Sequence, residues 1–206
     1  MPNWCNNTVT LEHEDPAMIA RAKAAFIKGE FLQEFIPCPQ DLIDTVSGFV
    51  DEQEALEAKQ AANRAKYGYP TWYEFNVANW GTKWDVGGGD GSYNDIEGGL
   101  ILTFDSAWSP PINAYEHLLE QGFKIQAMYY EPGMAFAGIW EDGNDDYYEY
   151  GGMNSDQIAE ELPPELDEAF GISEDAAQWE DEQEEENLDI DLDGGLSATN
   201  EQEDAQ

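Results

Sequence analysis

The sequence predicts an α+β fold made of two strand–helix–strand units with a long insertion between them. Two observations support this prediction. Residues 3–36 and 99–130 each begin with a strand-like segment, continue with a helical apolar spacing and end in a second short apolar run. Glycine and proline residues separate these segments, whereas residues 40–94 lack this strand–helix–strand pattern.

The first unit contains a strand, a helix and a second apolar run. Residues 8–11 alternate as a strand does, and Asp15-Pro16 supplies the cap and first turn of a helix over residues 17–28. Gly29 ends this helix. Residues 31–36 are then predicted to form the second strand, which Pro37-Cys38-Pro39 closes.

The second unit repeats the order and adds a hairpin. Residues 99–105 predict a central strand, and Pro110-Pro111 opens a helix that ends at Gly122. Two strands follow over residues 124–130 and 135–140, and residues 146–150 predict a charged edge strand. This order is the split βαβ arrangement of a ferredoxin-like sandwich with an added C-terminal hairpin.

The insertion, residues 40–94, is predicted to contain an exposed helix over residues 51–67 and then a tryptophan-rich stretch over residues 72–95. We expect a ferredoxin-like domain over residues 1–152, a short helical extension over 153–172 and a disordered acidic tail over 173–206.

The charge of the chain is strongly negative, with 45 acidic residues against 8 basic ones and a net charge of −37. Residues 1–150 hold 25 of the acids and all 8 bases, so residues 151–206 hold 20 acids and no base. This charge argues against direct binding to nucleic acid or to an anionic membrane. It favours a basic or nucleic-acid-binding protein as partner, although it also fits a simple role in solubility.

Two cysteines are too few for a disulfide framework, and the N-terminus lacks the basic and apolar regions of a signal peptide. No apolar run approaches the length that spans a membrane. We therefore expect a cytoplasmic protein with reduced thiols. Neither the cysteines nor the two histidines lie in a pattern typical of a zinc site or a catalytic triad, so no metal, cofactor or catalytic residue is predicted.

The candidate binding residues lie in the tryptophan-rich stretch, whose core at residues 79–85 lacks the apolar spacing of a plain helix or strand. In one interpretation Trp80 and Trp84 form an aromatic recognition platform. In the other they cover the open end of the sheet and Asp85 pairs with Lys83 or caps a turn. Lys83 is expected to be held by carboxylates or stacked on an indole ring. The full set is Trp72, Asn79, Trp80, Lys83, Trp84 and Asp85.

Three further patterns remain as alternatives. The glycine loop over residues 87–91 lacks the Gly-Lys-Ser/Thr ending of a P-loop, but Asp85, Asp90 and Asp95 could hold a cation. Trp72, Trp80 and Trp84 could line a small-ligand pocket. In the tail, apolar residues alternate with aspartates, as in a short motif that docks as an added strand. The tail residues are Leu188, Asp189, Ile190, Asp191, Leu192 and Asp193.

Two long strings resemble a known family. The opening MPNWCNNTV and the later WY…NWGTKWD look like the YubB-type ferredoxin-like proteins of conjugative plasmids and bacteriophages. The resemblance covers about residues 1–150, although residues 74–76 differ from many members, which carry another Trp and a basic residue there. It implies a ferredoxin-like fold and a mobile-element origin in a bacterial host, and it implies no reaction.

Together these observations predict a non-enzymatic accessory protein of a phage or plasmid. We expect it to bind a protein partner through its acidic surface, for example as a DNA-mimic inhibitor of host defence or restriction. The alternative is a cation-dependent enzyme or small-ligand-binding protein that uses residues 72–95.

Overall fold

The computed structural model describes residues 3–45 and 53–183. The chain divides into two compact units that meet in the sequence between Glu149 and Tyr150. The first unit contains a six-stranded sheet with helices, and the second is helical.

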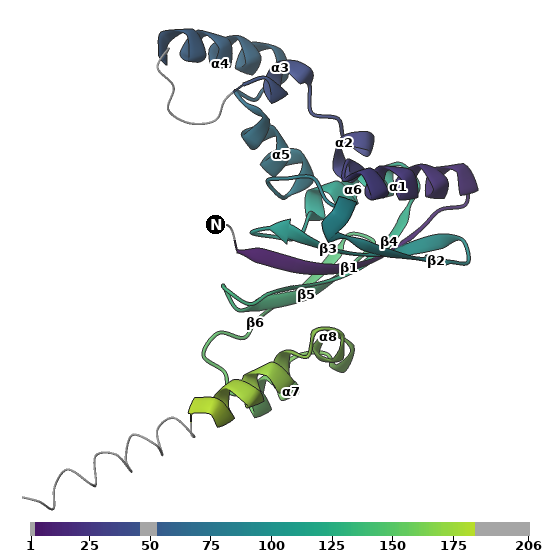
Figure 1. The fold of residues 1–206 in the computed structure, drawn as a ribbon, viewed down its shortest axis with the longest axis vertical. Helices are drawn as coiled ribbons and strands as arrows, with labels where there is room; N and C mark the ends of the chain where they lie inside the picture. The colour runs from purple at the N-terminus through teal and green to yellow at the C-terminus, as the bar shows by residue number, and fades with distance from the viewer. Residues whose placement is uncertain (1–2, 46–52, 184–206) are drawn as a thin grey trace, which may run out of the picture. The chain divides into compact units, whose positions relative to one another are not determined.

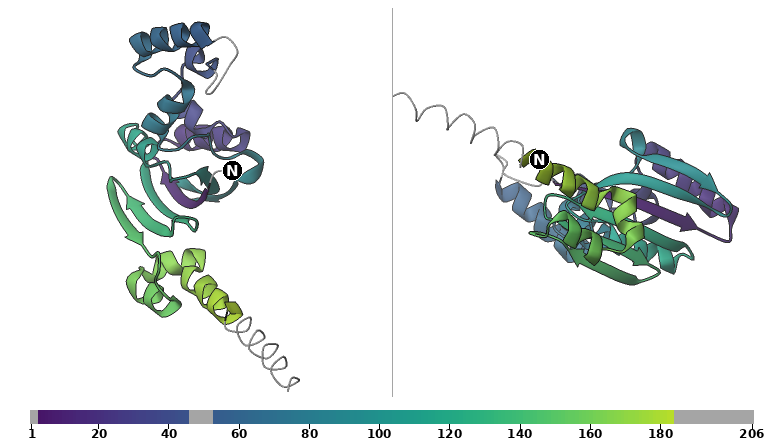
Figure 2. Two further views of the ribbon diagram at one scale, coloured as in Figure 1. Left: turned by 90° about the vertical axis from the view of Figure 1, so that its left-hand side faces the viewer. Right: turned by 90° about the horizontal axis from the view of Figure 1, so that it is seen from below.

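The sheet is antiparallel throughout and has the strand order β2-β3-β1-β4-β5-β6. Helices α1 (Pro16–Lys28) and α6 (Ile112–Glu120) lie on one face of it (Figures 1 and 2). Strands β1 to β4 with these helices form the split βαβ arrangement, and β5 and β6 extend it as a hairpin. The predicted ferredoxin-like α+β fold is therefore confirmed. The strands are β1 (Trp4–Glu12), β2 (Ser92–Ile96), β3 (Gly99–Ala107), β4 (Lys124–Glu131), β5 (Phe136–Glu141) and β6 (Asn144–Glu149).

The core lies between the sheet and these helices. Alternate residues of β1, β3 and β4 are buried, and Phe26 of α1 and Leu118 of α6 pack in the same apolar cluster. The Asp15 carboxylate accepts a hydrogen bond from the Ala17 N–H at 2.9 Å, which starts α1, and Gly29 ends it in the left-handed conformation.

The second strand of the first unit is not where the sequence pattern places it. Residues 31–36 do not form a strand, because Phe31–Phe35 is the short helix α2. Its buried residues, Phe31, Leu32 and Phe35, have the one- and four-residue spacing of a helix face. Strand β2 takes the place of the missing strand only after the insertion, so the interruption begins at residue 30 instead of residue 40.

The insertion contains helices α3 (Gln40–Ile43), α4 (Gln53–Tyr67) and α5 (Trp72–Trp80) and a 3₁₀ turn, η1 (Gly88–Asp90). The tryptophan-rich stretch therefore begins as a helix. Thr71 caps it by accepting a hydrogen bond from the Tyr73 N–H at 3.2 Å, and Gly81 ends it.

The second unit begins with α7 (Ser155–Glu161) and α8 (Pro164–Phe170), followed by a helical segment over residues 172–183. Glu180 accepts hydrogen bonds from the Ser155 N–H and hydroxyl at 2.9 and 2.8 Å, which joins the last segment to the start of α7. The prediction of disorder from residue 173 is therefore wrong for residues 173–183. The rest of the tail, including the motif at residues 188–193, lies outside the described residues. None of the described helices is long and apolar enough to cross a membrane.

Candidate recognition site

Trp80 belongs to the core. Its side chain is 4% exposed, and its indole N–H donates a hydrogen bond to the Ile36 carbonyl at 2.9 Å. A buried indole needs such an acceptor, because an unpaired N–H would lose its hydration without compensation. For this tryptophan, the structure supports the interpretation in which it completes the fold.

Residues 81 and 82 attach the insertion to the end of β3. The Thr82 hydroxyl donates to the Ala107 carbonyl at 3.0 Å and accepts from the Ala107 N–H at 3.1 Å. Gly81 has a φ of +84°, and a β-carbon there would approach the backbone N of Ile112 to 3.1 Å. The close approach of α5 to α6 therefore requires glycine at this position.

Asp85 caps helix α2. Its carboxylate accepts hydrogen bonds from the N–H groups of Leu32 at 2.7 Å, Gln33 at 2.9 Å and Val86 at 2.8 Å. Burial raises the pKa of the Asp85 carboxyl above its ordinary value, against the opposing effect of these three donors. Of the two roles predicted for Asp85, the structure shows the backbone cap and not an ion pair with Lys83.

Trp84 lies at the surface, unlike Trp80. It is 39% exposed and lies beside Trp4, which is 46% exposed, with the ring centroids 5.9 Å apart and the planes at 37°. The Lys83 ammonium lies 4.5 Å from the Trp84 ring centroid and 5.9 Å from that of Tyr73. Lys83 is thus stacked on an indole ring, one of its two expected arrangements.

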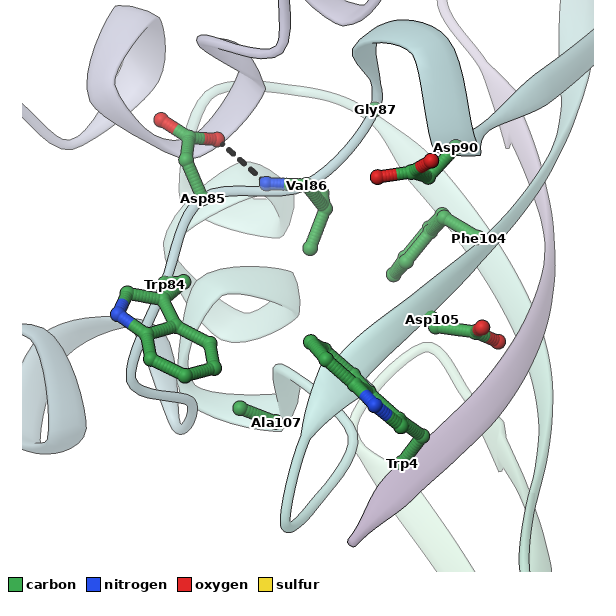
Figure 3. Close-up of a pocket in the computed structure, with 9 residues that line it drawn as sticks. All are labelled: Trp4, Trp84, Asp85, Val86, Gly87, Asp90, Phe104, Asp105 and Ala107. Atoms are coloured by element: carbon green, nitrogen blue, oxygen red, sulfur yellow. Dashed lines mark hydrogen bonds between the residues drawn. The ribbon is translucent and has the colours of Figure 1, made fainter. Parts of the chain in front are cut away.

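Trp4 and Trp84 border a cavity of about 480 Å³, which we call the Trp4–Trp84 cavity (Figure 3). Trp84 and the Asp90 carboxylate lie on opposite sides of it, with Phe104 next to Asp90, and Asp105 lies beside Trp4 with its carboxylate directed away from the indole rings. The lining residues come from β1, β3, η1 and the segment after α5: Trp4, Trp84, Asp85, Val86, Gly87, Asp90, Phe104, Asp105 and Ala107.

The glycine loop closes one end of this cavity and packs on α1. Gly87 has a φ of +96°, and a β-carbon there would lie 2.3 Å from the Phe26 carbonyl oxygen and 2.9 Å from its ring. Residue 87 is therefore glycine because its backbone passes directly over Phe26.

A second cavity of about 320 Å³ adjoins the first, since both are lined by Trp84 and Asp85. Its lining is mostly apolar and includes Trp72 and Trp80, so the three tryptophans proposed for a ligand pocket do lie around one hollow. Asn79 lines neither cavity, and its side chain donates to the Phe75 carbonyl at 2.8 Å within α5.

The three aspartates considered for a cation site are separately engaged. Asp85 caps α2, and Asp95 forms an ion pair with Lys23 at 2.6 Å. Asp90 lines the Trp4–Trp84 cavity. Across residues 3–45 and 53–183, no group of three or more His, Cys, Asp or Glu side chains has the arrangement of a metal site.

The N-terminal Asn-Trp-Cys-Asn-Asn string, residues 3–7, joins β1 to β3 beside the cavity. The buried Asn7 amide donates to the Cys5 carbonyl at 2.7 Å and to the Ser106 hydroxyl at 2.9 Å. Cys5 is fully buried, and burial raises the pKa of its thiol to about 12. The string therefore holds β1 against β3, and Cys5 is unsuited to act as a nucleophile.

The cavity residues that sequence reasoning missed include Trp4, Phe104 and Asp105. Alternation along β1 and β3 does predict that Trp4 and Asp105 point to the same side as each other if the strands pair. The register that sets Trp4 opposite Ala107 and Asn6 opposite Asp105 is a tertiary feature, and no local signal in the sequence reveals it.

Comparisons with known proteins assign no family to the chain. No family model and no curated protein matches it. Among solved structures, it is similar to the crystal structure of protein api92 from Yersinia pseudotuberculosis, of the family DUF1281. The two share 12% sequence identity with a TM-score of 0.40, over 74% of this chain and 99% of that one. Function is therefore inferred from the residues of this chain.

Proposed function

We propose that this protein is a non-enzymatic accessory protein that binds a basic protein partner through its acidic surface. The observation that supports this most directly is the charge of the second unit. Residues 151–183 hold 11 acidic residues and no lysine or arginine, and most of these acids are exposed on α7, α8 and the segment over residues 172–183. Such a surface attracts a basic protein and repels nucleic acid.

The first unit adds to this negative field because several of its cations are already engaged. Arg21 pairs with Glu34 at 2.6 Å, and Lys66 pairs with Asp41 at 2.8 Å. Lys23 pairs with Asp95, and Lys83 stacks on Trp84. The described part of the first unit therefore also presents more carboxylates than available cations.

A protein surface that evolved to hold DNA or RNA is the natural complement of this charge. The resemblance to proteins of plasmids and phages favours a partner in bacterial defence or restriction, which acts on nucleic acid. We therefore propose a DNA-mimic inhibitor as the specific form of this function.

The test is capture of partners from a bacterial lysate on the immobilised full chain, followed by elution with duplex DNA or with salt. A DNA mimic should release its partner when duplex DNA is added at constant ionic strength. A variant with Glu160, Glu161, Glu168 and Glu174 changed to Gln should capture less of that partner. The matched control carries the same four-charge change at Glu54, Glu97, Glu116 and Glu120, in the first unit. If DNA releases nothing, the protein is not a DNA mimic. If both variants capture equally, the acidic second unit is not the binding surface.

A further inference from the structure

Trp4 and Trp84 expose aromatic surface that the fold does not need. Trp80 is buried, whereas Trp4 and Trp84 are 46% and 39% exposed and meet from distant parts of the chain. Exposed indole surface concentrated at a concave site is typical of a binding site. The cavity that they border is therefore a candidate for a ligand.

The lining of the Trp4–Trp84 cavity also carries carboxylates. Within the described residues, the Asp90 carboxylate has no hydrogen-bond or ion-pair partner, and Asp105 accepts one hydrogen bond, from the Asn6 amide at 2.6 Å. Asp85 also lines the cavity, but its carboxylate is occupied by backbone N–H groups. No lysine or arginine of the described chain is among the nine lining residues. The lining thus combines two indole rings with the carboxylates of Asp90 and Asp105.

These surfaces select a ligand of one chemical class. A cation carried on an apolar chain interacts favourably with both the indole faces and the carboxylates. An anion would be repelled, and a neutral apolar group would remove water from Asp90 and Asp105 without replacing their interactions. Lys83 already shows that the Trp84 ring accepts an ammonium group, with its Nζ 4.5 Å from the ring centroid.

We propose that the Trp4–Trp84 cavity binds the side chain of a lysine or arginine of the partner protein. This inference deepens the proposed function, on which it rests for the identity of the partner. The volume of about 480 Å³ admits the end of one basic side chain, so the cavity would fix the position of a partner that the acidic surface attracts.

The cavity can be tested without the partner. The indole N–H signals of the full chain are followed by NMR during titration with N-acetyl-lysine methylamide or N-acetyl-arginine methylamide, and with the neutral N-acetyl-norleucine methylamide as reference. We expect the cationic compounds to bind with a Kd on the order of 1 mM and the neutral one at least about tenfold more weakly. Equal binding of all three would overturn the proposal.

Matched variants locate the site. Asp90→Asn and Trp84→Leu should each weaken binding of the cationic compounds by about fivefold or more. Glu116→Gln removes an equal charge from α6, and Trp179→Leu removes an exposed tryptophan from the second unit, so neither should change binding. If the controls weaken binding as much as the cavity variants do, the cavity is not the site. If these compounds bind but duplex DNA releases no partner captured from the lysate, the cavity is supported as a binding site and the proposed function is rejected.

Discussion

The carboxylate of Asp85 accepts a hydrogen bond from the backbone N–H of Leu32, 53 residues earlier in the chain, at 2.7 Å. The first N–H groups of a helix have no partner within the helix, and here a distant side chain satisfies them. The contact joins the segment after α5 to α2, and it places Trp84 and Val86 on either side of Asp85 at the cavity.

Asp85→Ala should therefore destabilise the first unit. Three backbone N–H groups lose their acceptor, and we expect the free energy of unfolding to fall by about 2 kcal/mol. Urea denaturation followed by circular dichroism measures this change. Asp90→Asn is the control, because its carboxylate has no hydrogen-bond partner among the described residues, and it should change stability by less than about 0.5 kcal/mol. Equal losses in the two variants would contradict the capping role.

The same contact explains why part of the fold could not be predicted. Residues 31–36 carry four large apolar residues in six, a pattern that fits a buried strand or a short helix equally well. The cap that selects the helix comes from Asp85, so it is invisible in the local sequence. By contrast, α1 and α6 and strands β3, β4 and β5 carry their own start or stop signals, and their predicted positions agree with the structure.

Helix α5 had a local signal that was overlooked. Thr71-Trp72-Tyr73-Glu74 matches the Ser/Thr-x-x-Glu pattern of a capping box, and the Thr71 hydroxyl hydrogen-bonds both the Tyr73 N–H and the Glu74 carboxylate. The apolar spacing after it is poor because the buried face of α5 includes the polar Asn76, whereas Tyr73 and Val77 are exposed. In this segment, the cap was more informative than the periodicity.

Gly87→Ala should distort the glycine loop. A β-carbon at residue 87 would lie 2.3 Å from the Phe26 carbonyl oxygen, on a backbone with φ of +96°, so we expect a loss of about 2 kcal/mol or more in the free energy of unfolding. Gly89→Ala, two residues away, places its β-carbon in open space and should be nearly neutral. Thermal denaturation of the two variants provides the comparison, and a neutral Gly87→Ala would show that the loop does not need this glycine.

Trp80 and Trp84 should respond oppositely to truncation. Trp80→Leu creates a cavity in the core and leaves the Ile36 carbonyl without its indole donor, which we expect to cost about 3 kcal/mol of stability. Trp84→Leu removes a ring that is 39% exposed and should cost less than about 1 kcal/mol. Chemical denaturation distinguishes the two. A Trp84 variant as unstable as the Trp80 variant would assign both rings to the fold and remove the basis for a recognition role.

The difference in burial between Trp80 and Trp84 also shows how far the site could be predicted. The tryptophan-rich stretch does contribute Trp84 and Asp85 to the Trp4–Trp84 cavity, and its three tryptophans are the local signal that singles it out. Which tryptophan points to the core depends on the turn at Gly81 and on the pairing of β1 with β3, which brings Trp4 to the same place. Both are tertiary relationships, so Trp4 could not be recognised as the partner of Trp84.

The two thiols should react slowly with alkylating reagents. Burial raises the pKa of the Cys38 thiol from its ordinary 9.0 to about 11 and that of Cys5 to about 12. At pH 8, roughly one Cys38 in a thousand would then be a thiolate, so iodoacetamide should label the native chain about a hundredfold more slowly than the unfolded chain. Mass spectrometry after timed labelling measures both rates.

The raised pKa values of the thiols also determine the direction in which stability changes with pH. Because the folded-state pKa lies above the unfolded value, the unfolded chain loses its thiol protons first as the pH rises. The contribution of the thiols to stability is therefore intact below pH 9 and declines as the pH approaches 11. Cys38→Ser should remove part of that decline, and an unchanged alkaline profile in this variant would contradict the assignment.

Lys83→Met should strengthen binding of basic compounds to the Trp4–Trp84 cavity. The Lys83 ammonium lies over the Trp84 ring, where it repels a second cation and competes for the same aromatic surface. Methionine keeps a flexible apolar side chain at residue 83 without the charge, so we expect the Kd for N-acetyl-lysine methylamide to fall by about threefold. Lys124→Met changes the net charge equally on β4, away from the cavity lining, and should have little effect. If removal of the Lys83 charge weakens binding instead, Lys83 supports the cavity structurally and its ammonium does not compete with the ligand.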